Sequence, residues 1–154
     1  MANLTRRKAG FSIMDLTKTY PRSPYAKLGN LYMLGRTVDK ARAKLDGDLG
    51  EYLYDCPLDK ILFSFLQISA GQLLRIVSEV TEADDIVARI VSAQATLNAD
   101  DIATFNRRVS ALAPEDVDTQ AYFDNLRQQV APNHPEIKTW FDLIEAEEGR
   151  LTGS

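Results

Sequence analysis

The only cysteine of the chain, Cys56, stands directly before Pro57 at a predicted helix start. A helix N-terminus carries partial positive charge and Lys60 follows one turn later, and both favour the nucleophilic thiolate. A catalytic cysteine also needs a base in contact with it. The only histidine, His134, lies in a proline-rich turn far along the chain, where a helix cap explains it better. We therefore predict that Cys56 is structural and reacts slowly in the native protein.

Charged residues gather on one long predicted helix and on the connection behind it. Arg42 falls on the apolar stripe of this helix, so we expect it to be buried and paired with a carboxylate, Glu51 or Asp59. Arg36 and Lys40 share a helix face at i, i+4 spacing. Two interpretations stay open: an internal salt-bridge network that locks the helix to the connection, or a pocket whose cations bind an anionic group.

The candidate site is the junction between this helix and the connection. Its members are Arg36, Asp39, Lys40, Arg42, Glu51, Tyr52, Cys56 and Asp59. The leading hypothesis is a non-catalytic binding or interaction module whose partner is an anionic small molecule or another protein. The alternative is a small enzyme that uses Cys56 or the carboxylates of Asp39, Glu51 and Asp59. The lack of a credible catalytic pair in the sequence favours the first hypothesis.

The spacing of apolar residues predicts an all-α fold, a single-domain bundle of about seven helices. The first is predicted over residues 24–45, with Ser23 as its N-cap and Pro24 at its first position. A glycine tolerated inside this helix indicates close packing. The last helix is predicted to run to about Glu148. Start signals for the remaining helices lie at Pro57, Ser69, Thr81, Asn98, Asp118 and after Pro135.

Residues 1–14 are predicted to form a flexible arm and residues 15–150 a single helical domain. Within that domain, the apolar faces of the helices predict the core. The side chains expected to be buried are Leu31, Val38, Leu62, Phe65, Ile76, Ile90, Phe105 and Trp140.

Composition argues against several classes of protein. The apolar and charged shares, 45% and 26%, are ordinary for a soluble globular protein. No apolar stretch approaches the ~20 residues of a membrane-spanning helix, so we expect no membrane partner. One cysteine and one histidine leave too few ligands for a zinc site, and we predict neither metal nor cofactor. A single cysteine also fits a reducing cytoplasm, because it excludes an internal disulfide.

Charge is unevenly spread along the chain. Residues 1–60 carry a net +4 and residues 61–154 a net −8. This asymmetry can mark an anion-binding half, but attraction between the halves or plain solvation explains it more simply. Predicted helices after Ser69 and Thr81 have the spacing of a helix-turn-helix. The second begins Glu82, Ala83, Asp84 and Asp85, whose negative charges phosphates would repel, so we predict no nucleic-acid partner.

Several short motifs give the chain a resemblance to a known family. They are the run PRSPYAKLGNLYMLGRTVDKARA, then GEY, then CPLD and LFSFL, all between residues 21 and 66. Together they resemble a bacterial protein family classified only as a domain of unknown function, and the similarity runs from about Asp15 to Glu148. The resemblance implies a bacterial cytoplasmic protein with a helical fold. It transfers no catalytic residue.

Overall fold

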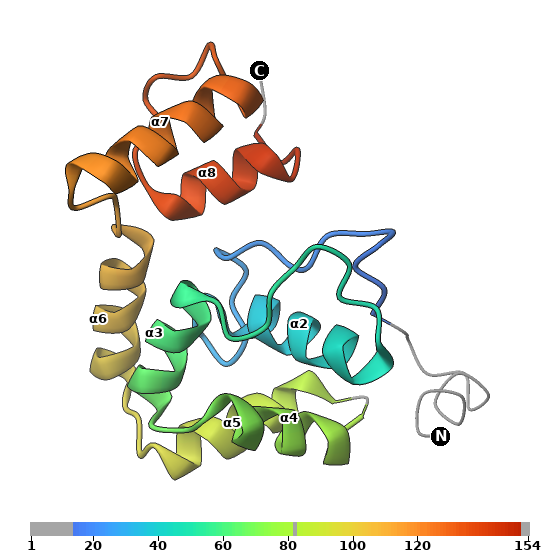
Figure 1. Cartoon of the computed structure of the whole chain (residues 1–154). Coiled ribbons are helices and arrows are strands. Elements are labelled where there is room, and N and C mark those ends of the chain that lie inside the picture. Colours follow the sequence, from blue (N-terminus) through green and yellow to red (C-terminus); the bar gives the residue numbers. More distant parts are fainter. Residues whose placement is uncertain (1–13, 82, 152–154) are drawn as a thin grey trace.

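A computed structural model describes residues 14–81 and 83–151 of the chain. Within these ranges there are seven α-helices and no strand, which confirms the predicted all-α fold class (Figure 1). The helices are α2 (Leu34–Asp46), α3 (Pro57–Leu66), α4 (Ala70–Glu79), α5 (Asp84–Gln94), α6 (Ala99–Ser110), α7 (Val117–Val130) and α8 (Trp140–Glu147). Most of the predicted N-terminal arm, residues 1–13, lies outside the described residues.

The first helix is shorter than the sequence predicts, because α2 begins at Leu34 and not at residue 24. The preceding segment turns through three residues in the left-handed region, Gly29 (φ 56°), Asn30 (φ 64°) and Met33 (φ 72°). Gly29 therefore lies in a turn and not inside a helix. Its role in close packing still holds, because a Cβ at this position would lie 2.8 Å from the Cβ of Ala88 on α5.

The predicted cap of that helix also has a different function. The Ser23 hydroxyl accepts a hydrogen bond from the backbone N–H of Tyr25 at 3.1 Å, and the backbone N–H of Met33 donates to the carbonyl of Pro24 at 2.9 Å. Both bonds stabilise a turn. The segment therefore uses one side-chain bond and one long-range backbone bond in place of helical hydrogen bonds, which the pattern of apolar spacing does not reveal.

The helix starts that carry a capping box agree best with the sequence. Ser69 caps α4 in a reciprocal pair with Gln72, and α3 begins at Pro57 as predicted. Three starts are displaced: α5 begins at Asp84, α7 is capped by Asp116 and not by Asp118, and α8 is capped by Thr139.

The larger hydrophobic cluster surrounds α2. In Figure 1, α4 and α5 lie on one side of α2, α3 lies beside α2, and α6 lies beyond α3. All five helices contribute to this cluster. Five of the eight predicted core side chains are buried: Leu31, Val38, Leu62, Ile76 and Phe105. The other three, Phe65, Ile90 and Trp140, are only half-buried, because each lies at the edge of its cluster.

A second, smaller cluster lies between α7 and α8, at the opposite end of the molecule from α4 and α5 (Figure 1). Its buried members are Phe123, Ala131, Ile137 and Leu143. Helix α8 also contributes to the larger cluster, because Phe141 is fully buried there. Its ring packs edge-on against the ring of Tyr25, with 5.0 Å between the ring centroids.

No single helix within residues 14–81 and 83–151 is both long enough and apolar enough to cross a membrane. Helices α3 and α4 meet the length and composition criteria only as a pair, and they are bent by 79° at the break between them. Their main apolar side chains, among them Leu62, Leu66 and Leu73, are buried in the larger cluster.

Candidate functional site

Arg42 is buried as predicted, but the predicted partner was wrong. Its guanidinium contacts the carboxylate of Asp84 at 2.5 Å and donates to the carbonyl oxygens of Val80 and Thr81. The expected partners were Glu51 and Asp59 in the following connection, yet Arg42 reaches Asp84 at the start of α5. The partner comes from a segment that only the tertiary fold brings close, so sequence proximity was the wrong criterion.

Asp84 joins this arginine to a second one, Arg22, which no sequence pattern had indicated. Arg22 contacts Asp84 at 2.7 Å and Asp39 at 3.0 Å, so Asp39 belongs to this network. Burial alone would raise the pKa of Asp84, but the hydrogen bonds and charges of the two arginines outweigh burial and lower it. The guanidinium of Arg22 lies over Gly35, where a Cβ would come within 3.1 Å of it.

A second ion pair joins α2 to the start of α3. The Lys40 ammonium lies 2.7 Å from the carboxylate of Asp59, and both side chains are almost fully buried. Asp59 also accepts hydrogen bonds from the Thr37 hydroxyl at 2.7 Å and from the backbone N–H of Cys56 at 3.2 Å. The predicted salt bridge between the first helix and the following connection is therefore present, with Lys40 in the place expected for Arg42.

The same ammonium also reaches the only thiol. Lys40 donates to the sulfur of Cys56 at 3.3 Å, at the N-terminus of α3. Cys56 is half-buried and faces a pocket. His134, which a catalytic Cys/His pair would require, instead lies 2.8 Å from Glu136 in the turn before α8.

A third cluster attaches the end of α8 to α2. The Glu148 carboxylate accepts two hydrogen bonds from Arg36, at 2.8 and 2.7 Å, one from the Tyr52 hydroxyl at 2.7 Å, and one from Arg150 at 2.6 Å. Burial would raise the pKa of Glu148, but these donors outweigh burial and lower it. Burial and then the bond to Glu148 raise the pKa of Tyr52.

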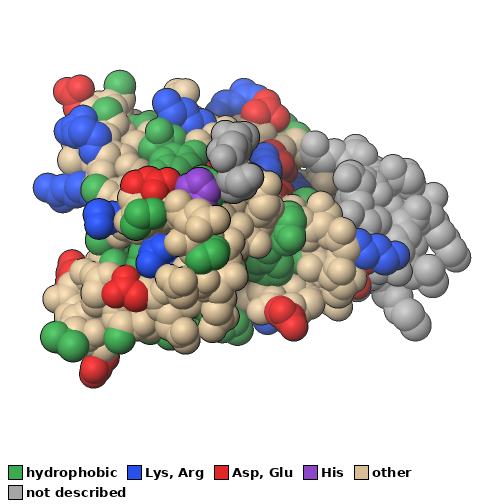
Figure 2. Space-filling model, turned by 90° about the horizontal axis from the view of Figure 1, so that it is seen from above, with side chains coloured by type: hydrophobic (Ala, Val, Ile, Leu, Met, Phe, Trp, Pro, Cys, Tyr) green, Lys and Arg blue, Asp and Glu red, His purple; other side chains and the backbone are tan. Residues whose placement is uncertain are grey.

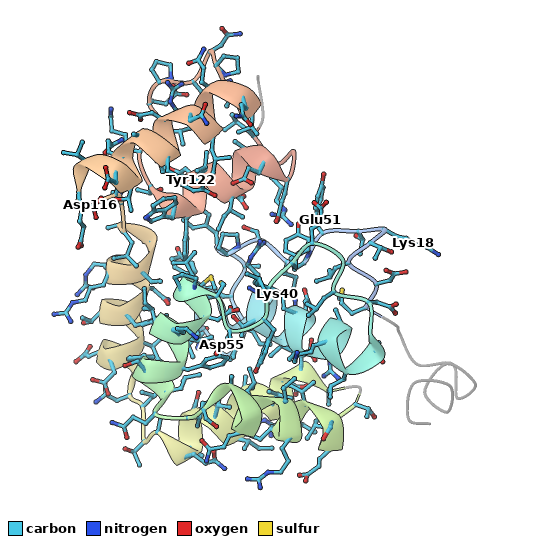
Figure 3. The ribbon with its side chains drawn as sticks, viewed as in Figure 1. Lys18, Lys40, Glu51, Asp55, Asp116 and Tyr122 are labelled. Carbon is cyan, nitrogen blue, oxygen red and sulfur yellow. The ribbon has the colours of Figure 1, made fainter. Side chains whose placement is uncertain are left out.

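These clusters border a pocket of about 1150 Å³. Its walls come from residues 16–20, α2, the connection to α3, α7 and α8. Figure 3 shows Tyr122 of α7 on one side and Glu51 on the other, with Lys40 of α2 below and between them. Segments near both ends of the chain therefore contribute to the lining of the pocket.

Five of the eight candidate residues line this pocket: Arg36, Lys40, Glu51, Tyr52 and Cys56. The other three, Asp39, Arg42 and Asp59, lie in the ion pairs behind it. Sequence reasoning missed the lining residues Tyr20, Tyr122 and Glu148, which come from segments that carry no local signal for a shared site.

Charges of both signs are interspersed over the face seen in Figure 2, without a broad region of one sign. Within the described parts of the chain, no group of three or more histidine, cysteine, aspartate or glutamate side chains is placed to hold a metal ion.

The comparisons with known proteins support the resemblance seen in the motifs. A model for a domain of unknown function (DUF5069) matches residues 18–150. The chain belongs to this family. The DUF5069 match covers all seven helices and nearly all of the pocket lining. The comparison with curated proteins gave no match.

Proposed function

We propose that this protein is a non-catalytic binding module whose pocket takes the anionic group of a small molecule. The observation that carries the proposal is that two cations, Arg36 and Lys40, line the pocket although they are only 6% and 3% exposed. Buried charges are costly and are retained where fixed partners hold them. Held in this way, they offer preorganised donors to a ligand.

Each of these cations already contacts a carboxylate, Glu148 or Asp59, so the ligand adds to a neutral pair. An ammonium group has three N–H donors, and Lys40 directs two of them to Asp59 and Cys56. The third is the donor that we assign to the ligand. Lys18 adds positive charge at the pocket, because it also lines the pocket and its side chain is 83% exposed. Its ammonium lies 3.9 Å from the carboxylate of Asp15.

Two glutamates, Glu147 and Glu148, line the part of the pocket that α8 borders. Although Glu147 as a whole is exposed, desolvation of its carboxyl group, followed by the charge of Glu148, raises the pKa of Glu147. A further negative charge beside these two glutamates is unfavourable. The anionic group therefore belongs at the Lys40 side of the pocket.

Titration calorimetry with acetate and inorganic phosphate tests the proposal. We expect Lys18→Glu to weaken anion binding several-fold, because it reverses a charge at the pocket. Lys60→Glu is the matched control, since Lys60 is also exposed and also pairs with an aspartate, Asp55, but does not line the pocket. Equal weakening by both variants, or no binding by the wild type, would contradict the proposal.

One observation favours a second candidate, an enzyme that uses Cys56. The Cys56 thiol accepts a hydrogen bond from the Lys40 ammonium at 3.3 Å, and Asp59 holds this ammonium in place. A fixed positive charge beside a thiol favours the thiolate, which is the nucleophilic form. Of the carboxylates in this alternative, Asp39 and Asp59 are less suited because they are buried in ion pairs, whereas Glu51 is exposed and lines the pocket. Alkylation with iodoacetamide at neutral pH separates the candidates. The binding module predicts slower labelling of the folded protein than of the unfolded chain, and the enzyme predicts faster labelling.

The proposal locates the protein in a bacterial cytoplasm. Its support is the family resemblance and the single cysteine, which suits a reducing compartment.

A further inference from the structure

Large apolar side chains gather at the pocket. Seven such side chains are exposed within residues 14–81 and 83–151, and three of them line this pocket. These are Tyr20, Leu53 and Tyr122, exposed by 54%, 70% and 60%. Single exposed apolar residues need no explanation, but a group of them at one concave site marks a surface for binding.

The three side chains come from separate parts of the fold. Tyr20 precedes α2, Leu53 lies between α2 and α3, and Tyr122 lies on α7. Two half-buried residues, Leu58 and Ile144, continue the apolar lining. No local sequence pattern requires these segments to converge, so the apolar surface is a property of the assembled pocket.

The pocket therefore combines two kinds of surface. Apolar side chains exposed to solvent form one part, and the buried cations Arg36 and Lys40 form another. Ligand sites in proteins typically pair a mainly apolar lining with a few fixed polar groups, and about 300–1000 Å³ is their usual volume. At about 1150 Å³, this pocket has room for a body much larger than a simple anion.

We infer that the ligand is a free amphiphilic acid, with one carboxylate or phosphate head and an aromatic or aliphatic body. This inference rests on the proposed function and specifies its ligand. The head contacts the Lys40 ammonium, and the body lies against Tyr20, Leu53 and Tyr122. Burial of the body removes apolar surface from water on both partners, which supplies most of the binding energy.

Four probes separate the contribution of the head from that of the body. Decanoate, decanol and decyltrimethylammonium share a ten-carbon chain and differ in the head, whereas acetate keeps the carboxylate of decanoate without the chain. Titration calorimetry below the micelle concentration should show decanoate binding at least about tenfold more tightly than acetate. Decanol should bind more weakly than decanoate, because it lacks the charge. Decyltrimethylammonium should bind most weakly of the three long probes.

Surface variants test where the body lies. Leu53→Ser and Tyr122→Ser should each weaken decanoate binding about fivefold or more and leave acetate unchanged. Val117→Ser is the matched control: Val117 lies on the same helix as Tyr122 and is 83% exposed, but it does not line this pocket. All three positions are exposed, so the variants should keep the fold, which circular dichroism verifies.

The outcomes of these experiments test the amphiphilic ligand and the proposed anion binding separately. If acetate binds as tightly as decanoate, and the variants at Leu53 and Tyr122 change nothing, the amphiphilic ligand is wrong and anion binding stands. If decanol binds as tightly as decanoate, recognition of the anion is wrong and the proposed function falls with it. Sedimentation of the protein with phosphatidylglycerol vesicles would overturn the assignment to a free acid.

Discussion

The carboxylate of Asp84 lies between the guanidinium groups of Arg42 and Arg22, at 2.5 and 2.7 Å. Arg42 and Asp84 are 42 positions apart in the sequence, so this contact joins the middle of α2 to the first residue of α5. It holds two helices that also share the larger hydrophobic cluster.

Replacing Arg42 with methionine should lower the free energy of unfolding by about 3 kcal/mol, the lower end of the range for a broken buried pair. The lower end applies because Asp84 keeps Arg22 and is partly exposed. The carbonyl groups of Val80 and Thr81 also lose their donor. Urea denaturation measures the change.

Arg89→Met is the control for this substitution. Arg89 pairs with Asp85 in the same helix, but both side chains are exposed, so the loss should be at most about 0.5 kcal/mol. Similar losses in the two variants would mean that the Arg42–Asp84 pair adds no more than a surface ion pair.

Leu62→Ala should cost about 2–5 kcal/mol, because Leu62 is fully buried in the larger cluster and its truncation leaves a cavity. Its neighbour Ile61 is exposed by 39%, and Ile61→Ala should cost clearly less. The comparison by thermal or urea unfolding tests which face of α3 is inward, since the reverse order would assign the opposite face to the core.

Acid should destabilise the protein through Glu148 and Asp84. The pKa of each carboxyl group is lower in the folded chain, so the unfolded chain binds more protons as the pH falls. Their contribution to stability is complete above the pKa values of the unfolded chain, about 4. It is lost as the pH falls from there through the lower pKa values of the folded chain. Glu147, whose pKa is raised, opposes this trend weakly.

Melting temperatures measured from neutral pH to about pH 3 give the test. Glu148→Gln should be less stable than the wild type at neutral pH, and its stability should depend less on pH below about 4. A variant with the same acid dependence as the wild type would exclude Glu148 as a source of it.

Residues 15–150 should unfold as one unit. The only tryptophan, Trp140, packs against Phe123 in the smaller cluster, so its fluorescence reports on α7 and α8. Circular dichroism follows all the helices together. The two transitions should coincide in urea, as in a two-state domain. Earlier loss of the fluorescence signal would separate the α7–α8 unit from the remainder.

The sequence predicted the fold better than the partners within it. Local signals such as the capping box of Ser69 and Pro57 at the start of α3 define helix ends through neighbouring atoms, and these predictions were confirmed. The prediction of a helix through Gly29 was wrong. The apolar residues there keep a helical spacing, but the backbone at Gly29 is left-handed, and Ala88 on α5 leaves no room for a Cβ at this position.

The candidate site was predictable only where its contacts are short in sequence. The pairing of Lys40 with Asp59 lies within the segment that the motifs had singled out. The contact of Arg36 with Glu148 spans 112 positions, and only the position of α8 in the fold reveals it. A carboxylate at the end of a helix reads as a solvated terminus until its tertiary partner is known.

Helix α8 contributes Phe141 to one hydrophobic cluster and Leu143 to the other, while Ile144 faces the pocket. A rotation or shift of this helix would disturb both clusters at once, so the wall that it forms is stiff. The pocket then keeps a fixed width and selects its ligands by size. A series of homologous acids should accordingly show a sharp cut-off in length or girth, where a compliant wall would give a gradual decline.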